Sequence, residues 1–292
     1  MKPETIEHYL NRKHTKQSAK TYSFVIGNFL GLNPRAKYYQ YKDIVSYIEE
    51  IKKRYPKVST RNGILAAIKK YYDYLIETKQ RNDHPCRTFY IKGDNVAKRT
   101  QAHFQNFFSP TELDALLNRE NRYPHLKTRN KIIISLLIFQ ALTCDELIRL
   151  DIKDIDLDNS TIYIKSSAKL NRRLLKLERM QMEWIEDYLT FHRHKLVKCT
   201  TDRLLIGIRG DKETVEGIGG MLHPLKNLYP ERPLNAKTIR LSVIANWLNV
   251  YKHKLENVQE WAGHKYPSST LRYKRIDIAE QREKINKWHP LQ

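Results

Sequence analysis

The chain has 292 residues, of which 53 are basic and 32 acidic, so its formal net charge is +21 at pH 7. Hydrophobic residues make up 40%, which permits packed cores and argues against wholesale disorder, and the length suggests two domains. We expect no membrane span, no secretion signal, and neither a disulfide scaffold nor a Cys-based zinc finger from the three scattered cysteines.

The positive charge is spread along the chain. Residues 1–107 and the remaining residues both hold more basic than acidic side chains. A surplus of this size repels itself in a compact fold, and nucleic acid is the usual partner that relieves it. A merely soluble basic protein is the alternative. We expect a cytoplasmic, nucleoid-associated protein of which both halves contact a polyanion.

Residues 1–91 are expected to form a helical domain. Apolar side chains recur at helical spacing in 18–30, 43–54 and 59–79, and a turn signal follows at 82–85. Basic residues lie near the start of the third helix or off its apolar stripe. We assign them to a phosphate-facing surface, with a solvated face as the alternative: Lys57, Arg61, Lys69 and Lys70.

Residues 92–107 lack a clear period and are interpreted as a linker to a second domain, 108–292. Ser109 and Glu112 form a capping-box pattern at the start of that domain. A buried helix is predicted at 127–141, and Thr143 begins a second capping box with Glu146.

A small antiparallel sheet is predicted next. Alternation and β-branched residues indicate a strand at 160–165 and a return strand at 174–177, so 166–173 is a basic hairpin tip. A helix follows at 180–191, and the glycine- and proline-rich stretch 207–233 is expected to be loop. Further helices are predicted at 237–250, 255–261, 268–273 and 276–287.

Three side chains in the last third suggest phosphodiester chemistry. Tyr273 follows His264 by nine residues, and Arg240 precedes both in an amphipathic helix. A phenol can attack phosphorus, an arginine can stabilise the charge on the non-bridging oxygens, and a histidine can move or donate a proton. The alternative for Arg240 is a surface ion pair with Glu231 or Glu256.

These residues resemble the motifs of the tyrosine recombinase (integrase) family. Lys237-Thr238-Ile239-Arg240 looks like its His-x-x-Arg, Ala262-Gly263-His264 like its Leu-Gly-His, and Thr270-Leu271-Arg272-Tyr273 like its Thr-x-x-Tyr. Residues 168–173 resemble the hairpin that carries the family's lysine. The resemblance implies catalytic roles for Tyr273, Arg240, His264, Lys169 and Lys237, with Glu146 in support.

One position departs from the family. Its first arginine lies in Thr-Gly-Leu-Arg-x-x-Glu-Leu, and the matching segment here, 140–147, has Thr143 in the arginine position. Losing a phosphate contact can cost several kcal/mol in the transition state. Another cation could replace it, and Arg172 or Arg173 on the hairpin is favoured over Arg149.

The resemblance implies a mainly α fold with a small antiparallel sheet. A SAM-like helical domain and a catalytic domain would close on duplex DNA as a C-shaped clamp. The implied reaction is site-specific recombination through a 3′-phosphotyrosyl intermediate, without metal or cofactor. The partners are double-stranded DNA and three further copies of the chain in a homo-tetramer on paired sites, with a monomer or dimer in isolation.

Two other functions stay open at this stage. A recombinase homologue without activity could serve as a DNA-binding accessory or regulatory factor, which the threonine at 143 motivates. A topoisomerase-like enzyme would relax DNA without pairing two sites. The helix at 276–287 is expected to dock on a neighbouring protomer.

Overall fold

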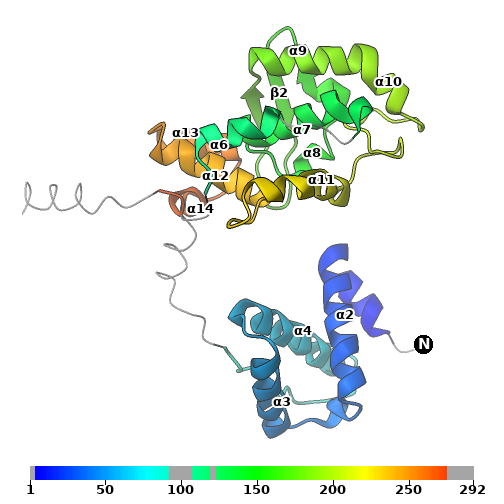
Figure 1. Cartoon of the computed structure of the whole chain (residues 1–292). Helices are drawn as coiled ribbons and strands as arrows, with labels where there is room; N and C mark the ends of the chain where they lie inside the picture. The colour runs from blue at the N-terminus through cyan, green and yellow to red at the C-terminus, as the bar shows by residue number, and fades with distance from the viewer. Residues whose placement is uncertain (1–3, 92–106, 119–122, 275–292) are drawn as a thin grey trace, which may run out of the picture. The chain divides into compact units, whose positions relative to one another are not determined.

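The computed structural model describes residues 4–91, 107–118 and 123–274, which belong to two compact units, 1–99 and 100–292 (Figure 1). Each unit has its own hydrophobic core. The predicted linker, 92–107, lies outside the described residues except for Phe107. The expected helix at 276–287 lies wholly outside them.

The N-terminal unit is helical, as predicted. Its helices are α1 (Ile6–Lys13), α2 (Lys16–Leu32), α3 (Tyr41–Arg54) and α4 (Val58–Glu77), with a 3-10 turn at Ala36–Tyr38 between α2 and α3. The short α1 was not predicted; the side chain of Thr5 caps it by accepting from the amide of His8. The core gathers one face of each helix, including Leu10, Phe29, Ile44, Ile68 and Tyr72.

The second unit begins with α6 (Pro110–Ala115), whose predicted capping box between Ser109 and Glu112 is present. Its other α-helices are α7 (Lys127–Phe139), α8 (Cys144–Leu147), α9 (Arg179–Asp187), α10 (Arg193–Leu196), α11 (Val215–Leu222), α12 (Ala236–Asn249), α13 (Leu255–Ala262) and α14 (Pro267–Leu271). A π-helical turn at Tyr188–His192 joins α9 to α10, and 3-10 turns lie at Leu116–Asn118, Pro124–Leu126, Ile152–Asp154 and His223–Leu228.

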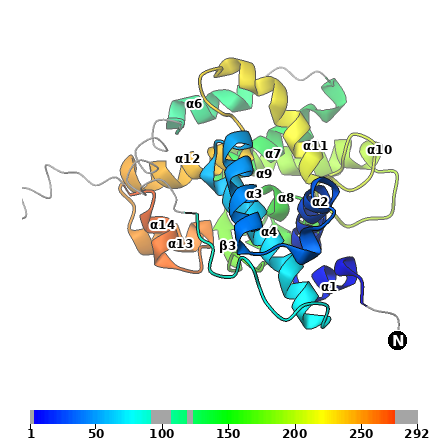
Figure 2. The same ribbon diagram turned by 90° about the horizontal axis from the view of Figure 1, so that it is seen from below.

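The sheet is antiparallel with the order β1-β2-β3. Its strands are β1 (Ile155–Asp156), β2 (Thr161–Ile164) and β3 (Arg173–Lys176). In the β2–β3 register, Ile164 pairs with Arg173 and Thr161 with Lys176, so β3 starts one residue earlier than predicted. This shift places Arg173 in the sheet instead of in the hairpin tip. Figure 2 shows β3 beside α13, with α14 next in line.

The expectation of loop throughout 207–233 is wrong. Helix α11 occupies part of it, because the Thr214 side chain accepts from the amide of Gly217 at the N-terminus while Ile218 and Leu222 pack into the core. The glycines of α11 lie on its exposed side, where they cost helix propensity but leave the buried stripe intact. In the described residues, no helix is long and apolar enough to cross a membrane.

Candidate active site

Arg240 lies in the middle of α12, a helix that is buried on almost every side. Its side chain is 8% exposed, and its guanidinium donates from Nη1 to the carbonyl of Ala141 and from Nη2 to that of Ala262 at 2.5 Å. The alternative of a surface ion pair between Arg240 and Glu231 or Glu256 is therefore wrong. Burial lowers the pKa of Arg240 to about 10, which still leaves it charged at neutral pH.

The loop before α8 supplies one of those carbonyls. Ala141 has φ +51°, in the left-handed region that favours glycine, and it occupies the position of the glycine in the family's Thr-Gly-Leu-Arg. Two residues later, Thr143 caps α8, as the sequence predicted. The threonine at the arginine position thus has a local structural role.

Glu146 is the anion of the site. Its Oε2 accepts from the amide and the hydroxyl of Thr143 at 2.9 and 3.0 Å, and its Oε1 accepts from Arg173 Nη1 at 2.6 Å. The side chains of Glu146 and Arg173 are each 1% exposed. Burial alone would raise the pKa of Glu146, but the bond from Arg173 and the Thr143 amide hold it below its usual value. Glu146 is therefore an ionised carboxylate.

Backbone contacts join the hairpin to the Gly-His segment. The amide of Asn171 donates to the carbonyl of Gly263 at 2.8 Å, and Leu170 forms a β-bridge with His264. The Ser167 hydroxyl accepts from the amides of Lys169 and Leu170, which tightens the turn. Lys169 is exposed on this hairpin, one residue from the bridge to His264.

His264 is held in one orientation by Thr270. Its Nδ1 lies 2.8 Å from the hydroxyl of Thr270, a fully buried residue on α14. Burial, with added repulsion from Arg240 and Arg173, lowers the pKa of His264 to about 4. The imidazole is therefore neutral at neutral pH. In the sequence Thr270 is recognisable only as part of a motif; its place three residues before the tyrosine is the signal that could have suggested this role.

Tyr273 follows α14 in a turn, since the helix ends at Leu271 and not at 273 as predicted. Its ring stacks near that of His264, with centroids 6.3 Å apart and planes 21° apart. Its carbonyl accepts from Asn249 Nδ2 at 2.7 Å, which ties it to α12. Burial raises the pKa of the phenol, and Arg240 and Arg272 oppose that rise. Attack by this phenol therefore requires a base that takes its proton or a cation that stabilises the phenolate.

Two other predicted residues are exposed. Lys237 lies in the first turn of α12, and Arg172 lines a pocket together with Glu256, Glu260 and His264. The less favoured cation, Arg149, donates to the carbonyls of Asp145 and Ser166.

The four basic residues predicted on the N-terminal unit differ from one another. Lys69 donates from Nζ to the carbonyls of Arg87 and Phe89 at 2.9 and 2.8 Å, and Lys70 pairs with Asp73 at 3.0 Å. Arg61 Nη2 donates to the carbonyl of Pro56 at 3.3 Å, while Lys57 is exposed. Lys69 therefore stabilises the last described segment of the N-terminal unit by binding its backbone carbonyls. A contact between these four residues and DNA stays a prediction.

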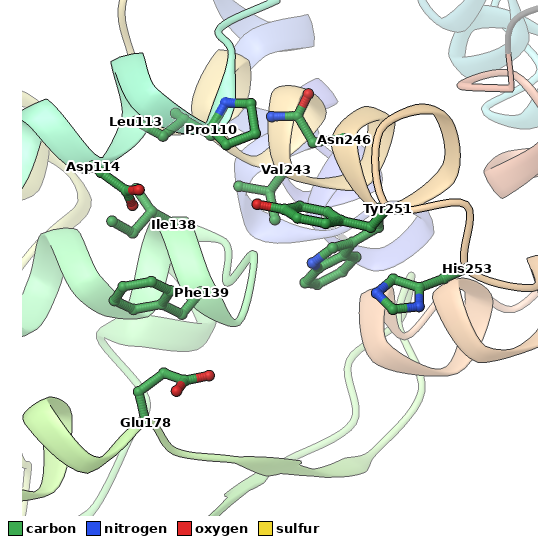
Figure 3. A pocket seen from close by; sticks show the side chains of 11 residues that line it. Pro110, Leu113, Asp114, Ile138, Phe139, Glu178, Val243, Asn246, Tyr251 and His253 are labelled. Carbon is green, nitrogen blue, oxygen red and sulfur yellow. The ribbon is translucent and has the colours of Figure 1, made fainter.

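A separate pocket lies on the second unit, between α6, α7 and α12 (Figure 3). Rings of Phe139 and Tyr251 face it, and the carboxylates of Asp114 and Glu178 lie on one side. It is lined by Pro110, Leu113, Asp114, Ile138, Phe139, Glu178, Val243, Asn246, Trp247, Tyr251 and His253.

The second unit combines α-helices with a three-stranded sheet and contains the cluster of Arg240, His264 and Tyr273. This is the organisation of a tyrosine recombinase catalytic domain. The sequence profile of the phage integrase family matches residues 106–280, and the chain belongs to this family.

Relatives agree with this assignment, and solved structures share the fold. The chain is 28% identical to the tyrosine recombinase XerD of Halalkalibacterium halodurans over 77% of this chain and 74% of that protein. It is 22% identical to a putative tyrosine recombinase of Caldanaerobacter subterraneus over 96% and 94% of the two chains. The fold is similar to that of XerH recombinase bound to its difH substrate, with a TM-score of 0.72, 19% identity, and coverage of 92% of this chain and 79% of that one. A Tn1549 transposon integrase bound to transposon-end DNA gives a TM-score of 0.68 at 15% identity over 98% and 99%.

Proposed function

We propose that this protein is a site-specific recombinase that cuts and rejoins duplex DNA through a phosphotyrosine at Tyr273, for integration, excision or resolution of a DNA element. The observation that carries the proposal is the single cluster in which Tyr273 stacks on His264, while Arg240 and Arg173 lie around the Glu146 carboxylate. A protein that only binds DNA has no need of an oriented phenol, imidazole and guanidinium together.

The reaction follows from these groups. The Tyr273 phenolate oxygen attacks the phosphorus of one DNA strand, the bond from phosphorus to the 5′-oxygen breaks, and a 3′-phosphotyrosyl ester forms. Neutral His264 accepts the phenolic proton or donates to a non-bridging oxygen, and Arg240 stabilises the added charge on those oxygens. Lys169, on the exposed hairpin, supplies the proton to the leaving 5′-oxygen. Attack by a 5′-hydroxyl from a partner strand reverses the step and restores the phenol.

The DNA partner is supported by charge. The net charge of +21 is shared by both units, so we infer that the two units hold duplex DNA together as a clamp. Lys237 and the basic residues near the start of α4 then contact the phosphate backbone, which positions the protein without reading sequence.

Assembly on paired sites would use the tail. Residues 276–287 carry Ile276, Ile278 and Ile285 together with three basic and three acidic side chains. The pocket of Figure 3 offers aromatic walls for the isoleucines and two carboxylates that can pair with the basic side chains of this segment. We infer that the tail of one copy docks in this pocket of the next, giving a tetramer on two DNA sites.

The function can be tested without knowing the target sequence. A randomised duplex pool carrying a nick is incubated with the protein, and DNA that stays attached in SDS is recovered and sequenced. We expect an enriched site and a covalent adduct at Tyr273. Sequence-specific binding without any adduct would favour the accessory DNA-binding factor, and relaxation of supercoiled plasmid with no preferred site would favour the topoisomerase-like enzyme.

A further inference from the structure

Arg173 is the residue whose surroundings the proposed function leaves unexplained. It starts β3, opposite Ile164, and its side chain is 1% exposed. Its Nη1 donates to Glu146, but Nε and Nη2 are buried without a hydrogen-bond partner in the described part of the chain. Burying guanidinium donors without a partner is costly, so such donors mark a place where an acceptor is expected.

The charges nearby say what kind of acceptor fits. The buried cluster contains two guanidinium groups, Arg173 and Arg240, and one carboxylate, Glu146. His264 is neutral, so the cluster has an excess of one positive charge. A buried net charge is unfavourable unless a counter-charge accompanies it. One singly charged anion balances the cluster, and a phosphodiester carries one negative charge.

The position of Arg173 brings it to the reacting groups. An added Cβ at Gly263 would lie 2.6 Å from Arg173 Nη1, so this guanidinium packs directly against the Gly-His segment. The adjacent hairpin tip, 166–172, also carries Lys169. Arg172, the other candidate from sequence, is exposed in a pocket lined also by His264, Glu256 and Glu260, and unlike Arg173 it has no buried donor without a partner among the described residues.

We propose that Arg173 binds the scissile phosphate in place of the arginine that is missing at position 143. This rests on the proposed recombinase function and adds the residue that completes its phosphate site. Glu146 holds Nη1, and Nε and Nη2 donate to a non-bridging oxygen opposite Arg240. These nitrogens are buried, so binding of the phosphate requires the neighbouring hairpin tip, 166–172, to shift away from them.

The test compares Arg173→Lys with Arg172→Lys on the nicked duplex recovered by selection. The lysine keeps a cation beside Glu146 but loses the planar set of donors. We expect Arg173→Lys to bind this DNA normally and to form the covalent adduct about 100-fold more slowly, the loss typical of one transition-state donor, while Arg172→Lys changes neither. Thr143→Arg in the Arg173→Lys background should recover part of the rate.

A second substrate separates phosphate binding from a structural role. Replacing a non-bridging oxygen of the scissile phosphate by a methyl group removes its charge. It also removes the oxygen that would accept from Nε and Nη2, so if Arg173 donates to that oxygen, Arg173→Lys loses much less on this methylphosphonate duplex than on the natural one. An equal loss on both substrates, or equal cleavage by wild type and Arg173→Lys, overturns the inference. If wild-type protein forms no adduct at all, the recombinase proposal itself fails.

Discussion

His264 Nδ1 and the Thr270 hydroxyl lie 2.8 Å apart, and this contact links the end of α13 to α14. Thr270 is fully buried, and the amide of Tyr273 donates to its carbonyl at 3.0 Å. One threonine therefore orients both the imidazole and the backbone of the phenol. The mutual position of His264 and Tyr273 depends on Thr270.

Replacing Thr270 by valine should uncouple this arrangement. Valine has the shape of threonine but no hydroxyl, so the imidazole loses its fixed orientation while the packing survives. We expect Thr270→Val to slow formation of the covalent adduct, by up to about 100-fold, without weakening DNA binding, because misplacing a reacting group has costs of that size. Thr270→Ser, which keeps the hydroxyl, serves as the control. Unchanged cleavage by the valine variant would show that His264 needs no such support.

The low pKa of His264 predicts a loss of stability in mild acid. In the folded protein this pKa is about 4, below the ordinary value of 6.5, so the unfolded chain binds the proton more readily. The stability that neutral His264 contributes to the folded protein is fully present above pH 6.5, is lost as the pH falls from 6.5 to 4, and does not change further below pH 4. Urea unfolding at several pH values should show a smaller loss in His264→Gln than in wild type. His194→Gln, at an exposed position, should follow the wild-type curve.

Much of the fold could be predicted from the sequence because it depends on local signals. The helical stripes of α2, α3 and α4 and the capping boxes at Ser109 and Thr143 are read from neighbouring residues. Helix α11 was missed because its glycines suggest loop, whereas its stability comes from a cap and two buried side chains.

The sequence predicts which residues make up the candidate site but not which of them contact one another. The spacing of His264 and Tyr273 indicated their chemistry, and Glu146 was expected in support. That Arg173 rather than Arg172 turns inward depends on the register of β3, since successive residues of a strand face opposite sides. The two residues cannot be distinguished from composition. Likewise, the carbonyls of Ala141 and Ala262 that hold Arg240 are distant in sequence.

The clamp predicts that the two units bind DNA cooperatively. Each unit has its own core, so fragments 1–100 and 101–292 can be compared with the whole chain. We expect each fragment to bind the selected duplex weakly, and the intact chain to bind much more tightly with a steeper dependence on salt, because more phosphate contacts release more counterions. Fluorescence anisotropy at several salt concentrations measures both. A fragment as tight as the whole chain would refute the clamp.

If the tail docks on a neighbouring copy, its removal should affect the pairing of two DNA sites but not the binding of one. A chain ending at residue 275 should bind a single DNA site normally but fail to form complexes containing two sites, since it lacks the segment proposed to dock on the next copy. Native gels with duplexes of two lengths report pairing directly. Tyr251→Asp, in the pocket of Figure 3, should reproduce the defect in the full-length chain. Normal pairing by both variants would contradict the proposed exchange.

Gly263 should be far less tolerant of alanine than Gly219 of the same unit. Its φ of +69° lies in the left-handed region, which costs an L-residue about 1–2 kcal/mol, and it caps α13. An alanine Cβ would also lie 2.6 Å from Arg173 Nη1, and that guanidinium cannot retreat without breaking its bond to Glu146. We therefore expect Gly263→Ala to lower the free energy of unfolding by about 2 kcal/mol or more and to slow cleavage.

Gly219→Ala is the matched control for this substitution. Gly219 lies inside α11 with no heavy atom within 4 Å of an added Cβ, so alanine should stabilise the protein by about 0.5–1 kcal/mol through helix propensity. Urea titration gives both free energies, and adduct formation gives both rates. If Gly263→Ala unfolds and cleaves like wild type, then Arg173 does not require this close approach, and the packing of the phosphate site against the Gly-His segment is refuted.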